Sequence, residues 1–108
     1  MLATSIYNSN SANETGGVAS ISTKTTVIGL CTAEIVGTAA ANMTIKVQGK
    51  LFSSGDPDVD TGWVDIVEFS NISDNSIVGR AIGVFTFLRV VVANNDNNAQ
   101  IQVAVGYN

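Results

Sequence analysis

Residues 43–51 constrain the fold more than any other part of this sequence. In the run MTIKVQGKL, apolar residues or glycine occupy the odd positions and polar residues occupy the even positions. Successive side chains of a β-strand point to opposite faces of its sheet, so a period of two produces one apolar face and one hydrated face. The segment is therefore predicted to be an antiparallel strand with one buried face.

The rest of the chain shows the same preference for β-structure. Valine, isoleucine and threonine supply 14, 10 and 10 residues, whereas leucine supplies only 4. β-Branched residues are enriched in strands, and turn-forming residues separate the apolar segments at short intervals. We predict an all-β protein, an antiparallel β-sandwich or jelly roll of about 7–8 short strands. Besides residues 43–51, the predicted strands are residues 2–7, 18–23, 25–35, 62–69, 77–82, 84–93 and 99–107.

Alternation within these strands also predicts the core. The turn NNDNN at residues 94–98 tolerates left-handed backbone geometry, so residues 84–93 and 99–107 are expected to pair as a hairpin. The side chains predicted to be buried are Ile45, Val47, Leu51, Ile66, Leu88, Val90, Ile101, Val103 and Val105.

The length of 108 residues fits one domain, which we divide into residues 1–17 and residues 18–108. The first part has the apolar side chains Leu2, Ile6 and Tyr7, followed by the polar run NSNSANETGG. Such a segment can lie in the groove of a neighbouring subunit or add a strand to an exposed sheet edge. We expect a short strand with a polar arm or loop that contacts another subunit, followed by the β-sandwich. The alternative is that residues 2–7 form an integral edge strand of the same domain.

Composition excludes several classes of function. The chain has no histidine, one cysteine and no GxSxG motif, so no serine or threonine has an obvious activating base. We therefore predict that the protein is not an enzyme and needs no cofactor. With net charge −4 and five scattered lysines and arginines, it lacks the basic stripe that binds nucleic acid. No segment approaches the roughly 18 apolar residues of a membrane span, and no secretory signal is visible, so we expect no membrane partner.

One acidic run has the spacing of a metal-binding loop. Asp56, Asp58 and Asp60 alternate in DPDVDTGW, as the oxygen ligands of a calcium loop do. Thr61 stands where an EF-hand needs glycine, and Val67 stands where it needs the bidentate glutamate. A solvated acidic turn is the favoured interpretation, and a weak divalent-cation site is the alternative.

Trp63 and Arg89 each have two interpretations. Trp63 either packs at the end of the core, which we favour, or forms a stacking platform for a sugar. Arg89 lies in the apolar run FLRVVV and needs a partner there, either Asp65 or Glu68 or a group across a subunit boundary. Asp65 and Glu68 are three residues apart, which places them on opposite faces of a regular strand and excludes a paired acid–base role.

The segment of residues 84–93 is apolar on both faces. A strand of this kind is covered on both sides. In a two-layer sandwich the second cover is expected to come from another subunit. We therefore predict an interface on this strand at Phe85, Phe87, Arg89 and Val91, in addition to Leu2, Ile6 and Tyr7 in the N-terminal segment.

Two long segments, TIKVQGKLFSSGDPDVDTGWVDIVEFS and FTFLRVVVANNDNNAQIQVAVGY, resemble small virion proteins of tailed bacteriophages. The resemblance covers residues 44–107 and is carried by Gly49, Gly62, Trp63, Ile66, Phe87, Arg89, Val90 and Val92. It implies a β-sandwich or jelly-roll subunit, often a homotrimer, that acts as a capsid cement or decoration protein. The implied partner is the major capsid protein, and the implied location is the capsid surface of a virion made in the host cytoplasm.

A second function stays open at this point. A carbohydrate- or receptor-binding module of a tail or fibre assembly would use Trp63 and the loop of residues 56–60 at its tip.

Overall fold

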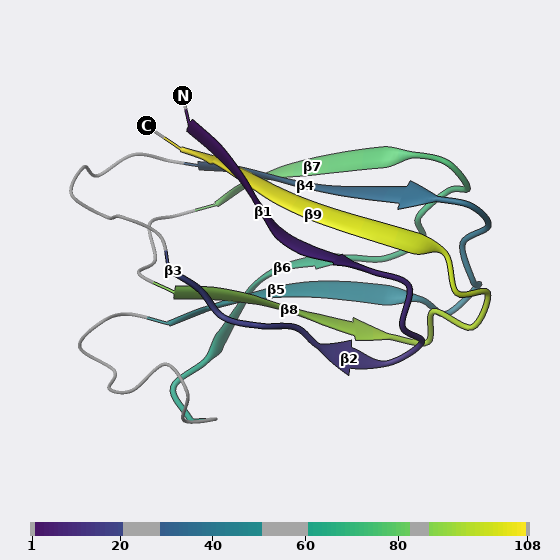
Figure 1. The fold of residues 1–108 in the computed structure, drawn as a ribbon, viewed down its shortest axis with the longest axis horizontal. Helices are drawn as coiled ribbons and strands as arrows, with labels where there is room; N and C mark the ends of the chain where they lie inside the picture. The colour runs from purple at the N-terminus through teal and green to yellow at the C-terminus, as the bar shows by residue number, and fades with distance from the viewer. Residues whose placement is uncertain (1, 21–28, 51–60, 83–86, 108) are drawn as a thin grey trace.

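The computed structural model describes residues 2–20, 29–50, 61–82 and 87–107, and all regular structure in these residues is β-strand. The strands form two antiparallel sheets that pack face to face, as the two layers of Figure 1 show. The predicted all-β sandwich is therefore confirmed. The described residues contain nine strands where about 7–8 are expected, because the two-residue strand β2 lies in the segment predicted to be a polar arm or loop. The strands are β1 (Leu2–Ser9), β2 (Glu14–Thr15), β3 (Ala19–Ser20), β4 (Gly29–Val36), β5 (Thr44–Lys50), β6 (Val64–Phe69), β7 (Ile77–Ile82), β8 (Phe87–Ala93) and β9 (Gln100–Tyr107).

Strand pairing follows a nested order along the chain. The four-stranded sheet has the order β1-β9-β4-β7, and the five-stranded sheet has the order β2-β8-β5-β6, with β3 also beside β8. The first strand thus pairs with the last, β2 and β3 pair with β8, β4 pairs with β7, and β5 pairs with β6. In this nested order the innermost pair is β5 with β6.

The asparagine-rich turn after β8 joins the two sheets. β8 pairs with β5, β2 and β3, whereas β9 pairs with β1 and β4 in the other sheet. The expected hairpin between these two strands is therefore wrong. Asn94 and Asn98 do adopt left-handed geometry, with φ of 60° and 49°. Such residues permit a sharp change of direction, but they do not specify whether the next strand pairs with the previous one or crosses to the opposite sheet.

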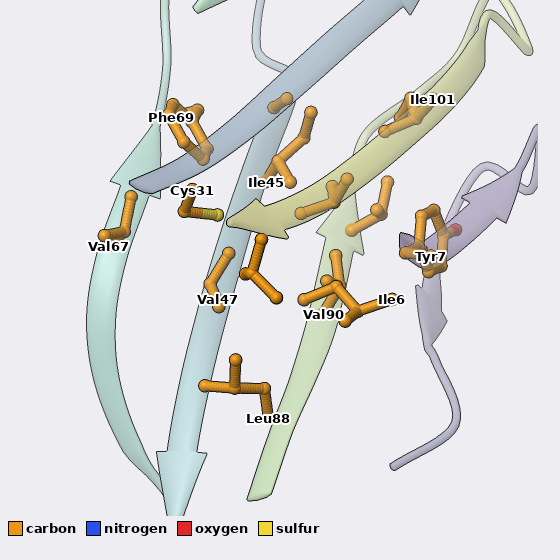
Figure 2. Close-up of a cluster of buried hydrophobic side chains, with 14 of the residues drawn as sticks. Ile6, Tyr7, Cys31, Ile45, Val47, Val67, Phe69, Leu88, Val90 and Ile101 are labelled. Atoms are coloured by element: carbon orange, nitrogen blue, oxygen red, sulfur yellow. The ribbon is translucent and has the colours of Figure 1, made fainter. Parts of the chain in front are cut away.

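The hydrophobic core lies between the sheets and follows the predicted alternation. Every second side chain of β8 is buried, and the same holds for β4. Ile66 is only partly buried, and Leu51 lies outside the described residues. Figure 2 shows side chains of both sheets meeting in this layer. The predicted core residues that are buried are Ile45, Val47, Leu88, Val90, Ile101, Val103 and Val105.

β1 is an integral edge strand of the four-stranded sheet. It pairs with β9 along its length, and a register shift between Ser5 and Tyr7 turns both Ile6 and Tyr7 toward the core. These two side chains are only 9% and 5% exposed. They therefore pack inside their own chain and do not serve as anchors for a neighbouring subunit. The edge-strand alternative describes β1 correctly, because burying these two side chains in the sandwich removes more apolar surface from water than an extended free arm would.

The polar residues after β1 are held by the turn between β8 and β9. Figure 1 places this turn and the β1–β2 connection at the same end of the sandwich. Asn95 is fully buried. Its Nδ2 donates to the carbonyl oxygen of Ala99, and its Oδ1 accepts from the N–H of Ala99. Hydrogen bonds join successive residues of the two loops: Asn98 Nδ2 to Asn10 O, Asn95 Nδ2 to Ser11 O, Asn95 N to Ala12 O, and Asn94 N to Asn13 Oδ1.

Candidate interaction surfaces

The outer face of the five-stranded sheet carries a row of linked polar side chains, which we call the polar ladder. Its members are Lys46, Gln48 and Lys50 of β5, Asp65 of β6, Arg89 of β8, and Trp63 just before β6. Arg89 Nε donates to Gln48 Oε1 at 2.7 Å, and Gln48 Nε2 donates to Asp65 Oδ1 at 2.8 Å. Lys46 Nζ lies 3.6 Å from Asp65 Oδ2. Gln48 and Arg89 are directly opposite in the β5–β8 register, so strand pairing itself brings the two side chains together.

Trp63 lies against the cationic side chains of the polar ladder. The Arg89 guanidinium carbon is 4.4 Å from the centroid of the indole ring, and Lys50 Nζ is 5.6 Å from it. Both distances are within the range of cation–π attraction. Trp63 is partly buried over the outside of the sheet and does not belong to the core cluster, so the favoured core interpretation is wrong. Arg89 is linked to Asp65 through Gln48. From the sequence we expected Arg89 to pair with a carboxylate or with a group of a second subunit, and this glutamine was not among the expected partners.

A β-bulge in β6 brings two carboxylates to the same face. Asp65 is opposite Gln48 and Glu68 is opposite Lys46, because the register shifts by one residue between Val47 and Gln48. Residues opposite each other across a ladder share a face, so Asp65 and Glu68 both point outward. The expectation that they lie on opposite faces is wrong, since it assumed a regular strand. The extra residue, Ile66, is the predicted core residue that the structure leaves only partly buried.

The electrostatics of the polar ladder favour a charged Asp65. The hydrogen bond from Gln48 is the main cause that holds the pKa of Asp65 below its ordinary value, and the positive charge of Lys46 acts in the same direction. The carboxylate is about half exposed, so this effect is screened by water. Asp65 is therefore the negatively charged member of the polar ladder at neutral pH.

The predicted interface residues of β8 lie beside the polar ladder. Phe87, Arg89 and Val91 are partly buried on the outer side of this strand, whose inner side chains are fully buried. Part of the cover expected from a second subunit is therefore supplied by Trp63 of the same chain. Leu2 lies in β1, whose backbone pairs with β9. Phe85 and the candidate metal ligands Asp56, Asp58 and Asp60 lie outside the described residues.

The outer face of the four-stranded sheet differs in composition, and we call it the low-charge face. Three of its outward side chains are large, apolar and exposed: Leu30, Val36 and Ile77, at 45%, 49% and 62%. Glu34, opposite Ile77, is its single ionisable side chain in the described residues. The other outward positions in the described residues are Ser5, Asn8, Thr32, Gly79, Ala81, Gln100, Gln102, Ala104 and Gly106.

Tyr7 connects the two sheets at their edge. Its ring belongs to the core, and its hydroxyl donates to Glu14 Oε1 of β2 at 2.7 Å; Figure 2 shows the Tyr7 oxygen at the margin of the buried cluster. Burial, with a smaller contribution from Glu14, raises the pKa of Tyr7 to about 12. Gly16 packs so closely on the ring that a Cβ atom there would lie 2.7 Å from Tyr7 Cδ1. The contact therefore requires glycine at position 16.

The single cysteine of the chain, Cys31, is buried and forms no disulfide. Burial raises the pKa of the Cys31 thiol to about 11, so it is protonated at neutral pH and is a poor nucleophile. No group of three histidine, cysteine or carboxylate side chains in the described ranges could hold a metal ion. Nor do these ranges contain a helix long and apolar enough to cross a membrane.

Comparison with known proteins found no matching family model, no matching curated protein and no matching solved structure.

Proposed function

We propose that this chain is a structural subunit of a virion, of the capsid cement or decoration type, that acts by binding other subunits. On this proposal it forms a homo-oligomer, with a trimer as the first choice, and the oligomer binds the major capsid protein at the capsid surface. Contacts made only in the assembled shell would stabilise that shell by mass action, and many copies would multiply the effect. The proposal includes no catalysis.

The low-charge face is the observation that carries the proposal. Copies of a chain with net charge −4 repel one another through charged surfaces. A face with one carboxylate and three exposed apolar side chains lets them approach with the least repulsion and the most apolar burial. We therefore assign this face to contact with a second copy of the same chain.

The strand order supports the finer description of the fold as a jelly roll. A jelly roll is a long antiparallel hairpin rolled so that its two arms contribute to two sheets, and the nested pairing of β1 with β9, β2 and β3 with β8, and β4 with β7 follows that scheme. Viral capsid domains are among the proteins built in this way. The fold alone does not assign a function, so the proposal depends on the low-charge face.

Sedimentation of the Ile77→Glu variant tests the assignment. Ile77 is 62% exposed and lies opposite Glu34, so the substitution should leave folding intact while placing a second carboxylate in the contact. We expect the wild-type chain to sediment as an oligomer at micromolar concentration and the variant to sediment as a monomer. Val64→Glu is the matched control, because Val64 is 57% exposed on the other sheet and should not affect association. A monomeric wild-type chain that also fails to bind capsid shells would contradict the proposal.

A carbohydrate- or receptor-binding module remains the second candidate, and the polar ladder is where it would act. Gln48, Asp65 and Trp63 combine hydrogen-bonding groups with an aromatic ring on one face. The Arg89 guanidinium already lies over that ring, which makes the ring a weaker platform for a sugar. A glycan array probed with the wild type and Trp63→Ala would distinguish this candidate from the first.

A further inference from the structure

The free edge of β7 has backbone groups that point away from the sheet. Ile35 N donates to Ser76 O at 2.8 Å, and the register places Glu34 opposite Ile77, so Ile35 and Ser76 form a hydrogen-bonded pair. Such pairs alternate with non-bonded pairs in an antiparallel ladder. The residues of β7 at the non-bonded positions are Ile77, Gly79 and Ala81, and their N–H and C=O groups face outward. In the described residues no strand pairs with β7 on that side.

Arg80 covers the centre of this edge. Its Nη1 donates to the carbonyl oxygen of Gly79 at 2.9 Å, which is one of the outward-facing acceptors. Arg80 is opposite Cys31, whose side chain is fully buried, so its register position faces the inner layer although the side chain is exposed. A charge held at an edge strand opposes the addition of another strand, because pairing would desolvate that charge and displace it from the Gly79 carbonyl.

We propose that the β7 edge is a pairing site for a second copy of this chain, and that Arg80 keeps it closed. The segment is self-complementary about Gly79: in an antiparallel pair centred there, Ile77 faces Ala81 of the second copy and glycine faces glycine. Each of the three residues whose N–H and C=O face outward is then opposite such a residue of the other copy. Every outward N–H can therefore donate to an outward C=O of the second strand. The same arrangement joins the low-charge faces of two copies into one continuous surface.

A guarded edge would keep subunits discrete when many copies are concentrated on one surface, as in the proposed function. Edge pairing adds to any other contact between copies, and the combination of two different contacts permits open-ended assembly. A guarded edge leaves association to the faces of the sandwich. This inference goes beyond the proposed function, because it holds whether the wild-type chain is a monomer or a closed oligomer.

Removal of the guard is the direct experiment. In sedimentation velocity over a range of concentrations, Arg80→Thr should form larger species than the wild type, in amounts that grow with concentration. Lys46→Thr is the matched control: it removes the same charge from β5, which is an inner strand of the other sheet, and should sediment as the wild type does. If Arg80→Thr keeps the wild-type distribution at every concentration, the proposal is wrong.

A second substitution tests whether the larger species form through this edge. Proline at position 79 removes an outward-facing N–H without breaking a bond to β4. A Cβ atom there meets its nearest neighbour, Leu30 Cδ1, at an ordinary 3.5 Å. Gly79→Pro combined with Arg80→Thr should therefore restore the wild-type distribution. If far-ultraviolet circular dichroism shows that this double variant has lost its β-structure, Ala81→Pro combined with Arg80→Thr replaces it in the experiment. Larger species that persist in a folded double variant would overturn the proposal.

Discussion

The two outer faces of the sandwich differ in whether side chains on neighbouring strands bond one another. On the five-stranded sheet, Gln48 bonds the directly opposite Arg89 and Asp65, and Lys46 forms an ion pair with Asp65 on the diagonal, so the polar ladder is linked by its own hydrogen bonds and ion pair. On the low-charge face, Ile77 is opposite Glu34 and Ala81 is opposite Leu30, so the outward side chains have few mutual polar bonds to make. The comparison teaches that polar side chains bonded to one another on a face have less to gain from a second surface, whereas exposed apolar side chains gain by contact with one.

The largest expected effect comes from a substitution in the hydrophobic core between the two sheets. Val90 is fully buried between the sheets, whereas Val91 is partly buried on the outer side of the same strand. Val90→Asp should abolish folding, because an unpaired buried carboxylate costs several kcal/mol against a total stability of about 5–15 kcal/mol. Val91→Asp is the control and should fold with a lower melting temperature. Circular dichroism and thermal melting measure both, and equal losses would contradict the assignment of the two sides.

A second, smaller effect concerns the bond that joins the two sheets. The pKa of Tyr7 is raised from about 10 to about 12 in the folded state, so the folded chain holds this proton more tightly than the unfolded chain. The contribution is complete below pH 10 and is lost as the pH rises toward 12. The stability difference between wild type and Tyr7→Phe, measured by urea unfolding, should therefore fall across this range. A difference that is constant with pH would show that the phenol is not held by burial and Glu14.

The polar ladder is expected to contribute modestly to stability. Arg89→Ala removes the hydrogen bond to Gln48 and the contact with Trp63, and we expect a loss of about 1–3 kcal/mol in the free energy of unfolding. Trp63 is the single tryptophan of the chain, so a change in its emission spectrum reports the same event. Lys46→Ala breaks an exposed ion pair and should cost no more than about 1 kcal/mol. Unchanged emission in Arg89→Ala would contradict the stacked arrangement.

The smallest effect is the acid dependence of the polar ladder. The folded-state pKa of Asp65 lies below its ordinary value, so its contribution is present above the unfolded-state pKa and is lost as the pH falls through the folded-state pKa. The difference in melting temperature between wild type and Asp65→Asn should therefore disappear in acid. Glu68→Gln controls for the loss of one negative charge on the same face. A difference that persists unchanged in acid would argue against the Gln48 and Lys46 contacts.

Strand alternation predicted the core better than it predicted the chain path. Buried residues of β5, β8 and β9 follow from the period of two, because the geometry within a strand determines which side chains share a face. The pairing of β8 with β5 and of β9 with β1 and β4 depends on contacts between distant segments, so the local turn signal at residues 94–98 was misleading. The bulge at Ile66 places Asp65 and Glu68 on the same face, where opposite faces were predicted. The bulge too depends on pairing with a distant strand, so the local pattern did not reveal it.

The candidate surfaces show the same division. The sequence identified Arg89 as a cation that needs a partner and Trp63 as an isolated aromatic, but not that the two lie 4.4 Å apart. It gave no sign of the low-charge face, because the side chains of that face come from four strands distributed along the whole chain. The asparagine run suggested a turn, while the bonds from this turn to residues 10–13 depend on the two loops meeting at one end.

The amino-acid sequence by itself determined that this chain is an all-β protein with an apolar layer, because β-branched composition and a period of two act through local sterics and the burial of one face. Tertiary structure alone decided which strands are neighbours, that Ile6 and Tyr7 belong to the core, and that β7 is an edge strand among the described residues. The physical reason is that a backbone hydrogen bond can form with any strand of suitable geometry. The choice among partners is made by how all the faces pack at once.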